Sequence, residues 1–416
     1  MTVSSYSNFF SLFIFGLFMI PAIVLGLLGS KTEKIGINHA LKRYGMIISI
    51  PMMILLFGLN SKQMFQFVAF VLYEVLLVYI YYRFKKRANS EFVYYTVFSL
   101  SMLPILIVKA VPVLFSKILP LASPLIIDRK ICISADKFSF LGFIGISYIS
   151  FRIWQMIIEI HDDKIKEISL PEMLYFITFF STITSGPIDR YQRFKKDLEA
   201  EIETKDYIIN YLFVGIKKIF IGALYKFALA TFINIYIMQK LPPHATTFGT
   251  TVLYMYAYTF YLFFDFAGYS NFAVGTSYIL GIKTPENFNK PFLAHNMKEF
   301  WDRWHMSLSK WFGDYLFSRF VLNSLRNGTF KSKKTATRCG YMLTMFTMGL
   351  WHGFYLFYIV YGIYQGLMLV LTDIYVKSKT YRKFKKSKYY DAVSIAVCFH
   401  VVSFGMLLFS GYLFNF

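Results

Sequence analysis

Long apolar runs follow one another along the whole chain, and they limit its possible folds more than any other feature. The windows long enough to cross a hydrocarbon core of about 30 Å are 9–29, 44–59, 63–82, 92–108, 138–158, 219–238, 250–280, 340–358, 359–375 and 391–414. We expect helices there, because an unpaired backbone group in lipid costs several kcal/mol and no window alternates like a strand of a membrane β-barrel. The sequence therefore predicts an all-α polytopic membrane protein with about ten to twelve transmembrane helices.

The distribution of charge supports a membrane location and sets an expected orientation. Only 16% of the residues are charged, against about 25% in soluble proteins, yet the formal net charge is +21. We assign the excess Lys and Arg to loops that fix topology and meet anionic lipid headgroups, and expect no nucleic acid partner. By the positive-inside rule the loops that carry basic clusters face the cytoplasm, at 83–87, 193–196, 331–334 and 377–388.

The first apolar window has no basic residue before it, and Lys31 and Lys34 follow it. This order predicts an N-terminus outside the cell and argues against a cleaved signal peptide, whose positive charges precede its apolar core. We therefore expect a multi-pass protein of the cell membrane.

No stretch of the chain is typical of a second, soluble domain, because no polar segment reaches the usual size of a folding unit. We expect a single membrane domain over residues 1–416, in which 1–160 are mostly scaffold spans. From 171 to 366 the apolar runs are repeatedly broken by Pro, Gly, Trp, His and charged residues. Irregular backbone at membrane depth is tolerated only where it is buried in protein or lines a watery cavity, so 171–366 is the predicted catalytic zone.

Familiar motifs for metals, nucleotides and nucleophiles are missing. The three cysteines, Cys132, Cys339 and Cys398, are far apart and form no CxxC pair, so we interpret them as packing residues. Walker, GxSxG, HExxH and GxGxxG patterns are absent. We expect no metal site, and no cofactor bound by the chain itself.

His305 has unusual neighbours among the seven histidines. It lies between Glu299 and Phe312, a segment that holds three of the five tryptophans. On one helix at about 100° per residue, the aromatic side chains of this segment would share one side, with His305 at its edge. Such a helix is too short to span a membrane, so we expect it at an interface or tilted into a cavity. The alternative is an interfacial aromatic belt in which the histidine is incidental.

His352 lies inside a long apolar run, where an ionisable side chain is costly and is by default functional. Gly349 and Gly353 are one helical turn apart beside it, and their missing side chains would leave room for a thin substrate arm. The alternative is that the glycines allow close helix packing and that His352 is an interhelical hydrogen bonder.

Asp265 is a further charge within an apolar run. Its carboxylate could orient a histidine or pair with a buried Arg, and the structural role is favoured.

Four segments together resemble the signature of the membrane-bound O-acyltransferase family. They are Phe264–Ser270, Pro285–Phe292, Lys298–Ser309 and Gly349–Gly353, and their order and spacing match as well. Within the family, the compact length and the segment Ser185–Tyr191 are similar to the branch that adds D-alanine to teichoic acids. The chain departs from the family pattern at Gly313, where Arg is common, and at Gln365, where His is common.

The resemblance implies a ring of tilted helices, with interfacial or re-entrant helices, around a central tunnel. It implies that His305 and His352 form the tunnel's histidine pair, with His352 as the catalytic base. We expect the tunnel to be lined also by Trp301, Trp304, Trp351, Asp265 and Ser270.

The resemblance also implies the partners. An acidic carrier protein would bring D-alanine from the cytoplasm as a thioester on its phosphopantetheine arm. The acyl group would pass to lipoteichoic acid, or to an intermediate acceptor, on the outer side. A thioester is already activated, so the chain would need only a base, alignment and dry surroundings, and histidine suits the base because its pKa is near 6.5.

A basic stretch after the tryptophan segment is the expected docking site for the acidic carrier. It offers apolar side chains with a charged rim, an arrangement typical of protein interfaces. The residues are Phe317, Arg319, Phe320, Val321 and Leu322, with Arg326, Lys331, Lys333 and Lys334 beside them.

Two other functions remain open on the sequence. The first keeps the family and changes the acyl group, giving an O-acetyltransferase that acts on an exported polysaccharide. The second is a transporter in which the histidines relay protons.

Overall fold

The computed structural model describes residues 9–28, 37–58, 62–122, 143 and 145–414. Within these residues almost every regular element is a helix, and the extended pairing is a single bridge between Phe288 and Trp304. The prediction of an all-α protein is confirmed. Cys339 is half-buried and Cys398 is buried, both as free thiols, while Cys132 lies outside the described residues.

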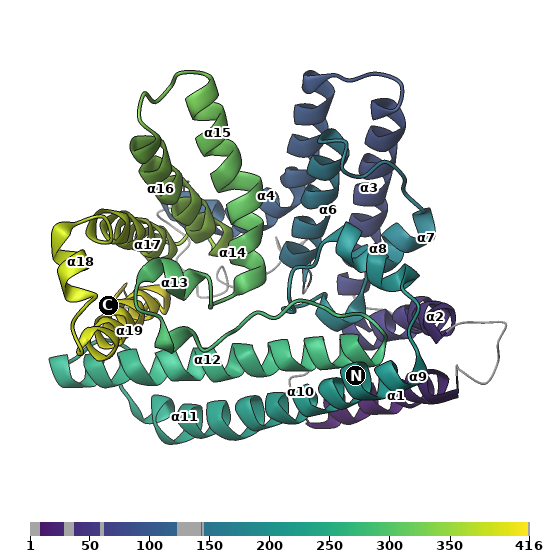
Figure 1. The fold of residues 1–416 in the computed structure, drawn as a ribbon, viewed down its shortest axis with the longest axis horizontal. Coiled ribbons are helices and arrows are strands. Elements are labelled where there is room, and N and C mark those ends of the chain that lie inside the picture. The colour runs from purple at the N-terminus through teal and green to yellow at the C-terminus, as the bar shows by residue number, and fades with distance from the viewer. Residues whose placement is uncertain (1–8, 29–36, 59–61, 123–142, 144, 415–416) are drawn as a thin grey trace. The chain divides into compact units, whose positions relative to one another are not determined.

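The chain divides into two compact units, each built from two stretches of sequence. The first unit combines the residues up to Ala223 with Gly268–Pro285, and the second combines Leu224–Ala267 with the residues from Glu286 on. The helix α12, Phe248–Ile279, contributes to both units and is unbroken (Figure 1). This division does not follow the predicted boundary between 1–160 and 171–366, and the single membrane domain stays a prediction.

The helices of the first unit, besides the end of α12, come from the N-terminal half of the sequence. They are α1 Phe9–Leu28, α2 Ile37–Phe57, α3 Lys62–Lys85, α4 Glu91–Ala122, α6 Ile146–His161, α7 Leu170–Ile177, α8 Tyr191–Glu199, α9 Thr204–Asp206 and α10 Phe213–Ala223, with a π-helical turn at Tyr207–Leu212. Arg152 of α6 is buried and links α6 to the segment that follows it. Its guanidinium donates hydrogen bonds to the carbonyl of Phe176, at 2.8 Å, and to the hydroxyl of Thr182. A buried charge that donates several hydrogen bonds in this way holds α7 and the turn after it in place.

The second unit holds the short helices of the tryptophan segment and the C-terminal helices. They are α11 Thr231–Tyr236, α13 Met297–Trp301, α14 Met306–Phe312, α15 Ser318–Arg326, α16 Lys333–His352, α17 Leu356–Tyr375, α18 Lys379–Phe384 and α19 Tyr390–Phe409, with π-helical turns at Leu224–Ala230 and Gly313–Phe317.

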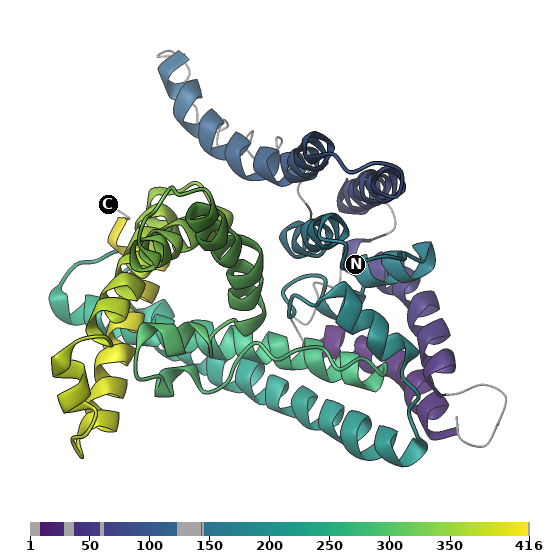
Figure 2. The same ribbon diagram turned by 45° about the horizontal axis from the view of Figure 1, so that its top comes forward.

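The helices α16 and α17 form an antiparallel pair joined by a short break after His352 (Figure 1, Figure 2). Two glycines bring them together: a Cβ on Gly349 would lie 2.5 Å from the carbonyl oxygen of Tyr358, and a Cβ on Gly362 would lie 2.7 Å from that of Met345. A Cβ on Gly353 would lie 2.9 Å from the ring of Tyr358. The prediction that Gly349 and Gly353 leave room for a substrate arm is therefore wrong. Close helix packing explains Gly349, and the ring of Tyr358 fills the space beside Gly353, which follows the end of α16.

Among the described residues, 6 helices are long and apolar enough to cross a membrane, which is fewer than the ten to twelve expected. They are His39–Phe57, Lys62–Lys85, Glu91–Ala110, Thr204–Lys240, Leu356–Tyr375 and Tyr390–Phe409. Two of the predicted windows differ for physical reasons: α6 has 16 residues and includes Arg152 and Glu159, and α16 ends at His352, inside the window 340–358. The multi-pass character of the protein is confirmed.

Candidate active site

The tryptophan segment does not form one helix, and the prediction of a continuous aromatic stripe from Glu299 to Phe312 is wrong. The helix α13 ends at Trp301 and α14 begins at Met306, with His305 between them in the left-handed region at φ 44 and ψ 49. A left-handed residue that is not glycine costs about 1–2 kcal/mol, and helical periodicity assumes that no such residue interrupts the run. The strained residue is the predicted catalytic histidine, as is common at active sites.

Asn287 holds this turn from the preceding loop. Its carbonyl accepts the N–H of Met306 at 2.9 Å, and its side-chain oxygen accepts the hydroxyl of Ser307 at 2.6 Å. An antiparallel β-bridge between Phe288 and Trp304 also joins this loop to the turn. Sequence reasoning gave Asn287 no role, although it lies in the segment Pro285–Phe292 that carries part of the family resemblance.

His352 is the last residue of α16, and its ring lies among aromatic side chains. Its ring centroid is 4.8 Å from that of Phe409, edge to face, and 4.5 Å from that of Trp351. Tyr361 of α17 packs on the same imidazole with a centroid separation of 6.3 Å.

The two histidines share one cavity of about 70 Å³. The two histidines are 47 residues apart in the sequence (305 to 352), yet they line the same space, as the predicted pair requires. The other walls are aromatic or aliphatic and come from α12, α13, α14, α16, α17, α19 and the turn between α13 and α14: Leu262, Phe266, Trp301, Trp304, Leu308, Met348, Tyr361, Met406 and Phe409.

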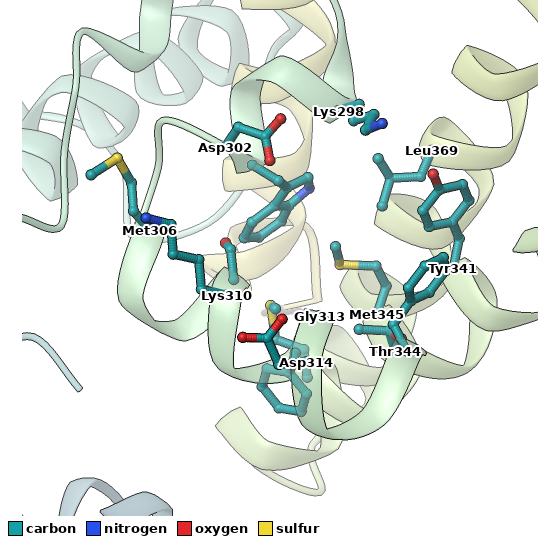
Figure 3. A pocket seen from close by; sticks show the side chains of 15 residues that line it. Lys298, Asp302, Met306, Lys310, Gly313, Asp314, Tyr341, Thr344, Met345 and Leu369 are labelled. Atoms are coloured by element: carbon teal, nitrogen blue, oxygen red, sulfur yellow. The ribbon is translucent and has the colours of Figure 1, made fainter. Parts of the chain in front are cut away.

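A larger chamber of about 430 Å³ adjoins the histidine cavity, and Figure 3 shows the side chains that line this chamber. Trp301 and Met348 belong to the walls of both spaces. One side of the chamber is charged and comes from α13, α14 and the turns that follow them: Lys298, Asp302, Lys310 and Asp314. The opposite side, from α16 and α17, is largely apolar and includes Tyr341, Thr344, Met345 and Leu369.

The environment of His305 keeps its imidazole neutral. The side chain is 5% exposed, and burial lowers its pKa to about 3. Its Nδ1 has no hydrogen-bond partner in the part of the chain that the structure describes. A neutral imidazole with one nitrogen unused can orient or polarise a substrate group, but it accepts a proton poorly.

Three of the other predicted tunnel residues, Asp265, Trp351 and Ser270, do not line the histidine cavity. Asp265 pairs with Lys226 at 2.5 Å and lines neither cavity, which supports its structural role with Lys in place of Arg. Trp351 packs on His352 without lining the shared cavity, and Ser270 is buried in the first unit. Trp301 and Trp304 do line the cavity.

The predicted docking residues do not form one exposed face. Val321 is 8% exposed and packs on α16 at Gly340, and Phe317 stacks on Tyr341 with ring centroids 5.0 Å apart. Leu322 is 66% exposed. The other two members, Arg319 and Phe320, are half-buried.

Comparisons with known proteins show which family the chain belongs to. The family model of the membrane-bound O-acyltransferases matches residues 137–414. The teichoic acid D-alanyltransferase of Bacillus subtilis (strain 168) is 40% identical over 98% of both chains, and that of Streptococcus thermophilus is 37% identical over 98% of this chain and 95% of its own.

A probable alginate O-acetylase of Pseudomonas syringae is 30% identical over 64% of this chain and 48% of its own. Both the family match and the near full-length relatives include the segments of the paired histidines. The chain therefore belongs to the membrane-bound O-acyltransferase family, and its activity is acyl transfer.

Proposed function

We propose that this protein moves D-alanine from a carrier-protein thioester to a hydroxyl group of lipoteichoic acid, directly or through an intermediate acceptor. The observation that carries the proposal is the shared cavity of His305 and His352, which adjoins a chamber wide enough for a donor arm. The near full-length similarity to teichoic acid D-alanyltransferases favours D-alanine as the acyl group.

The sizes of the two spaces fit a small acyl group on a longer arm. A cavity of about 150 Å³ takes benzene, so the 70 Å³ of the histidine cavity suits a group of a few heavy atoms and excludes a fatty chain. The chamber, at 430 Å³, falls in the usual range for small-molecule sites, about 300–1,000 Å³. The phosphopantetheine arm would occupy the chamber and reach past Trp301 and Met348.

The chemistry needs one proton acceptor. The acceptor hydroxyl attacks the thioester carbon while the imidazole of His352 takes its proton, so that a C–O bond forms. The C–S bond then breaks, and the thiolate of the arm leaves with the proton that His352 returns. Such proton transfer contributes about 10²–10⁴-fold, and holding the reactants at near-attack distance contributes a further ~7–11 kcal/mol.

His352 suits the base better than His305 does. A general base works best with a pKa near the operating pH, and burial lowers the pKa of His305 to about 3. His352 is half-buried rather than buried. His305 would instead orient the thioester or polarise its carbonyl.

The carrier would approach from the cytoplasmic side, where Lys331 of the basic loop and Lys333 and Lys334 at the start of α16 are exposed. The basic loop complements an acidic partner, and exposed Leu322 of α15 offers an apolar contact. In this orientation the N-terminus lies outside the cell, and the acceptor is reached from the outer side.

A second candidate is O-acetyl transfer to an exported polysaccharide. The partial similarity to alginate O-acetylases favours it, and an acetyl group would also fit the 70 Å³ cavity.

The test uses purified protein in lipid vesicles, with lipoteichoic acid as acceptor and carrier protein charged with radiolabelled D-alanine. We expect loss of label from the carrier and its gain by the acceptor, and no transfer from the same carrier charged with acetate to alginate. Transfer of acetate to alginate without transfer of D-alanine would favour the second candidate and overturn the first.

A further inference from the structure

Aromatic rings make up much of the wall around the paired histidines. Phe266, Trp301, Trp304, Tyr361 and Phe409 all line the 70 Å³ cavity, and the described lining includes no Asp or Glu. We propose that these rings bind the amine of the acyl group as a cation, so that the cavity selects D-alanyl over a neutral acyl group of the same size. The inference rests on the proposed function and names the group that the cavity recognises.

Two of the rings stand directly against the histidines. Phe266 meets the ring of His305 at a centroid separation of 4.7 Å and an interplanar angle of 82°, and Phe409 meets His352 at 4.8 Å and 82°. An acyl carbon placed for attack beside His352 would have its amine within a few ångströms of these rings. A cation over an aromatic face is attracted within about 6 Å of the ring centroid.

The charges around the cavity favour this mode of binding over an ion pair. No carboxylate belongs to the described lining of the cavity, and Asp265 of α12 is paired with Lys226. The acids Asp302 and Asp314 line the adjoining chamber, where Lys298 and Lys310 balance their charge. Burial lowers the pKa of His305, so its neutral ring does not repel a cation. The ring quadrupoles are therefore the main source of negative potential in the described walls.

The size of the cavity alone would give a different specificity. A purely apolar space of 70 Å³ admits D-alanyl and D-lactyl groups alike, because the two groups have the same number of heavy atoms. A desolvated cation–π contact would favour the ammonium group by roughly tenfold to thirtyfold. D-lactyl, in which a hydroxyl replaces the amine, is thus the discriminating donor.

The experiment compares kcat/KM for carrier protein charged with D-alanyl or D-lactyl thioester, using the full-length protein in vesicles. We expect wild type to prefer D-alanyl by about tenfold or more. Phe409→Leu, which keeps an apolar side chain and removes the ring, should reduce the preference to about a third or less of its wild-type value. The matched control is Phe399→Leu, the same change in the same helix outside the cavity, which should keep the wild-type preference.

A second measurement separates loss of the aromatic ring from a folding defect of the Phe409→Leu variant. Phenylalanine carrying one, two or three fluorines, incorporated at position 409, keeps the shape of the ring while weakening its negative face. The preference for D-alanyl should fall stepwise with fluorine number. Equal rates from both donors in wild type, or a preference unaffected by fluorination and by Phe409→Leu, would overturn the aromatic site while leaving D-alanyl transfer in place. Absence of transfer from either donor would overturn the proposed function itself.

Discussion

Asn287 is the residue on which the conformation of His305 most depends. The left-handed conformation of His305 is held by two hydrogen bonds that Asn287 accepts from Met306 and Ser307, the first residues of α14. A strained conformation persists only where its surroundings over-determine it. A change of side chain leaves the backbone bond to Met306 in place but removes the bond to Ser307, and its loss would let the turn relax and move the imidazole within the cavity.

We expect Asn287→Ala to lower kcat about 10–100-fold, because a displacement of about 1 Å at a reacting site can cost 10²-fold. The matched control is Asn289→Ala: that residue joins the same pairing through its backbone N–H, at 3.0 Å from the carbonyl oxygen of Arg303, and its side chain is exposed. The measurement is the single-turnover rate of D-alanyl transfer by each of the two variants. Similar losses in both variants would contradict the role given to the Asn287 side chain.

The buried neutral imidazole predicts a pH dependence of stability. Burial lowers the pKa of His305 from 6.5 to about 3, so the unfolded chain binds this proton more tightly than the folded one. The neutral form therefore contributes stability that is complete above about pH 6.5 and is lost as the pH falls towards 3. At about pH 5 the loss is about 2 kcal/mol.

Thermal unfolding in detergent micelles measures this effect. The unfolding midpoint of wild type should fall between about pH 7 and about pH 5, and His305→Gln, which cannot titrate, should show a smaller fall. Identical pH profiles for the two proteins would show that His305 is not held neutral by burial.

At this scale the sequence singled out the two histidines that line the shared cavity, because an ionisable residue in an apolar or tryptophan-rich run stands out. It could not show the left-handed turn at His305, since helical periodicity contains no signal for one residue that leaves the helix. Asn287 was missed for a related reason: its hydrogen bonds cross from one loop to another, 20 residues on for Ser307.

Among the elements, the pair α16 and α17 positions His352. The helices approach closely at Gly349 and Gly362, where no side chain separates the two backbones. The end of α16, and with it His352, is thus fixed relative to Tyr361 on α17. The sequence predicted two helices here but interpreted Gly349 as clearance for substrate, because the spacing of small residues does not show which surface they face.

Gly349→Ala should destabilise the protein by about 1–3 kcal/mol, since the new methyl would lie 2.5 Å from a backbone carbonyl that cannot move without shifting α17. Gly249→Ala in α12 is the control, because a Cβ there meets nothing within 4 Å. Thermal midpoints of the two variants in the same detergent give the comparison. A midpoint for Gly349→Ala equal to that of the control would show that the two helices are not closely packed at this point.

For the whole molecule, the sequence predicted the class, and the described residues hold 6 helices long and apolar enough to cross a membrane. Several apolar windows became helices that are short or carry basic residues, such as α6 with its buried Arg152. The two compact units could not be predicted, because α12 contributes to both and each unit joins stretches far apart in the sequence.

Recognition of the proposed carrier also belongs to the scale of the whole molecule, and Leu322 offers a sharper test of it than Val321, which is buried against α16. We expect Leu322→Asp to raise the KM for D-alanyl carrier about tenfold, because it removes an exposed apolar contact and adds charge that repels an acidic partner. D-alanyl-pantetheine without the carrier serves as control, and its transfer should be unchanged. An equal loss with both donors would place the defect in the catalytic unit instead of in docking.

The most direct test of the central claim is the single-turnover rate of D-alanyl transfer by wild type and His352→Ala in vesicles saturated with charged carrier. We predict a loss of about 10²–10⁴-fold in the rate of transfer, with carrier binding unchanged, because the variant lacks the base that takes the hydroxyl proton. A wild-type rate in His352→Ala would contradict the assignment of His352 and with it the mechanism built on the paired histidines.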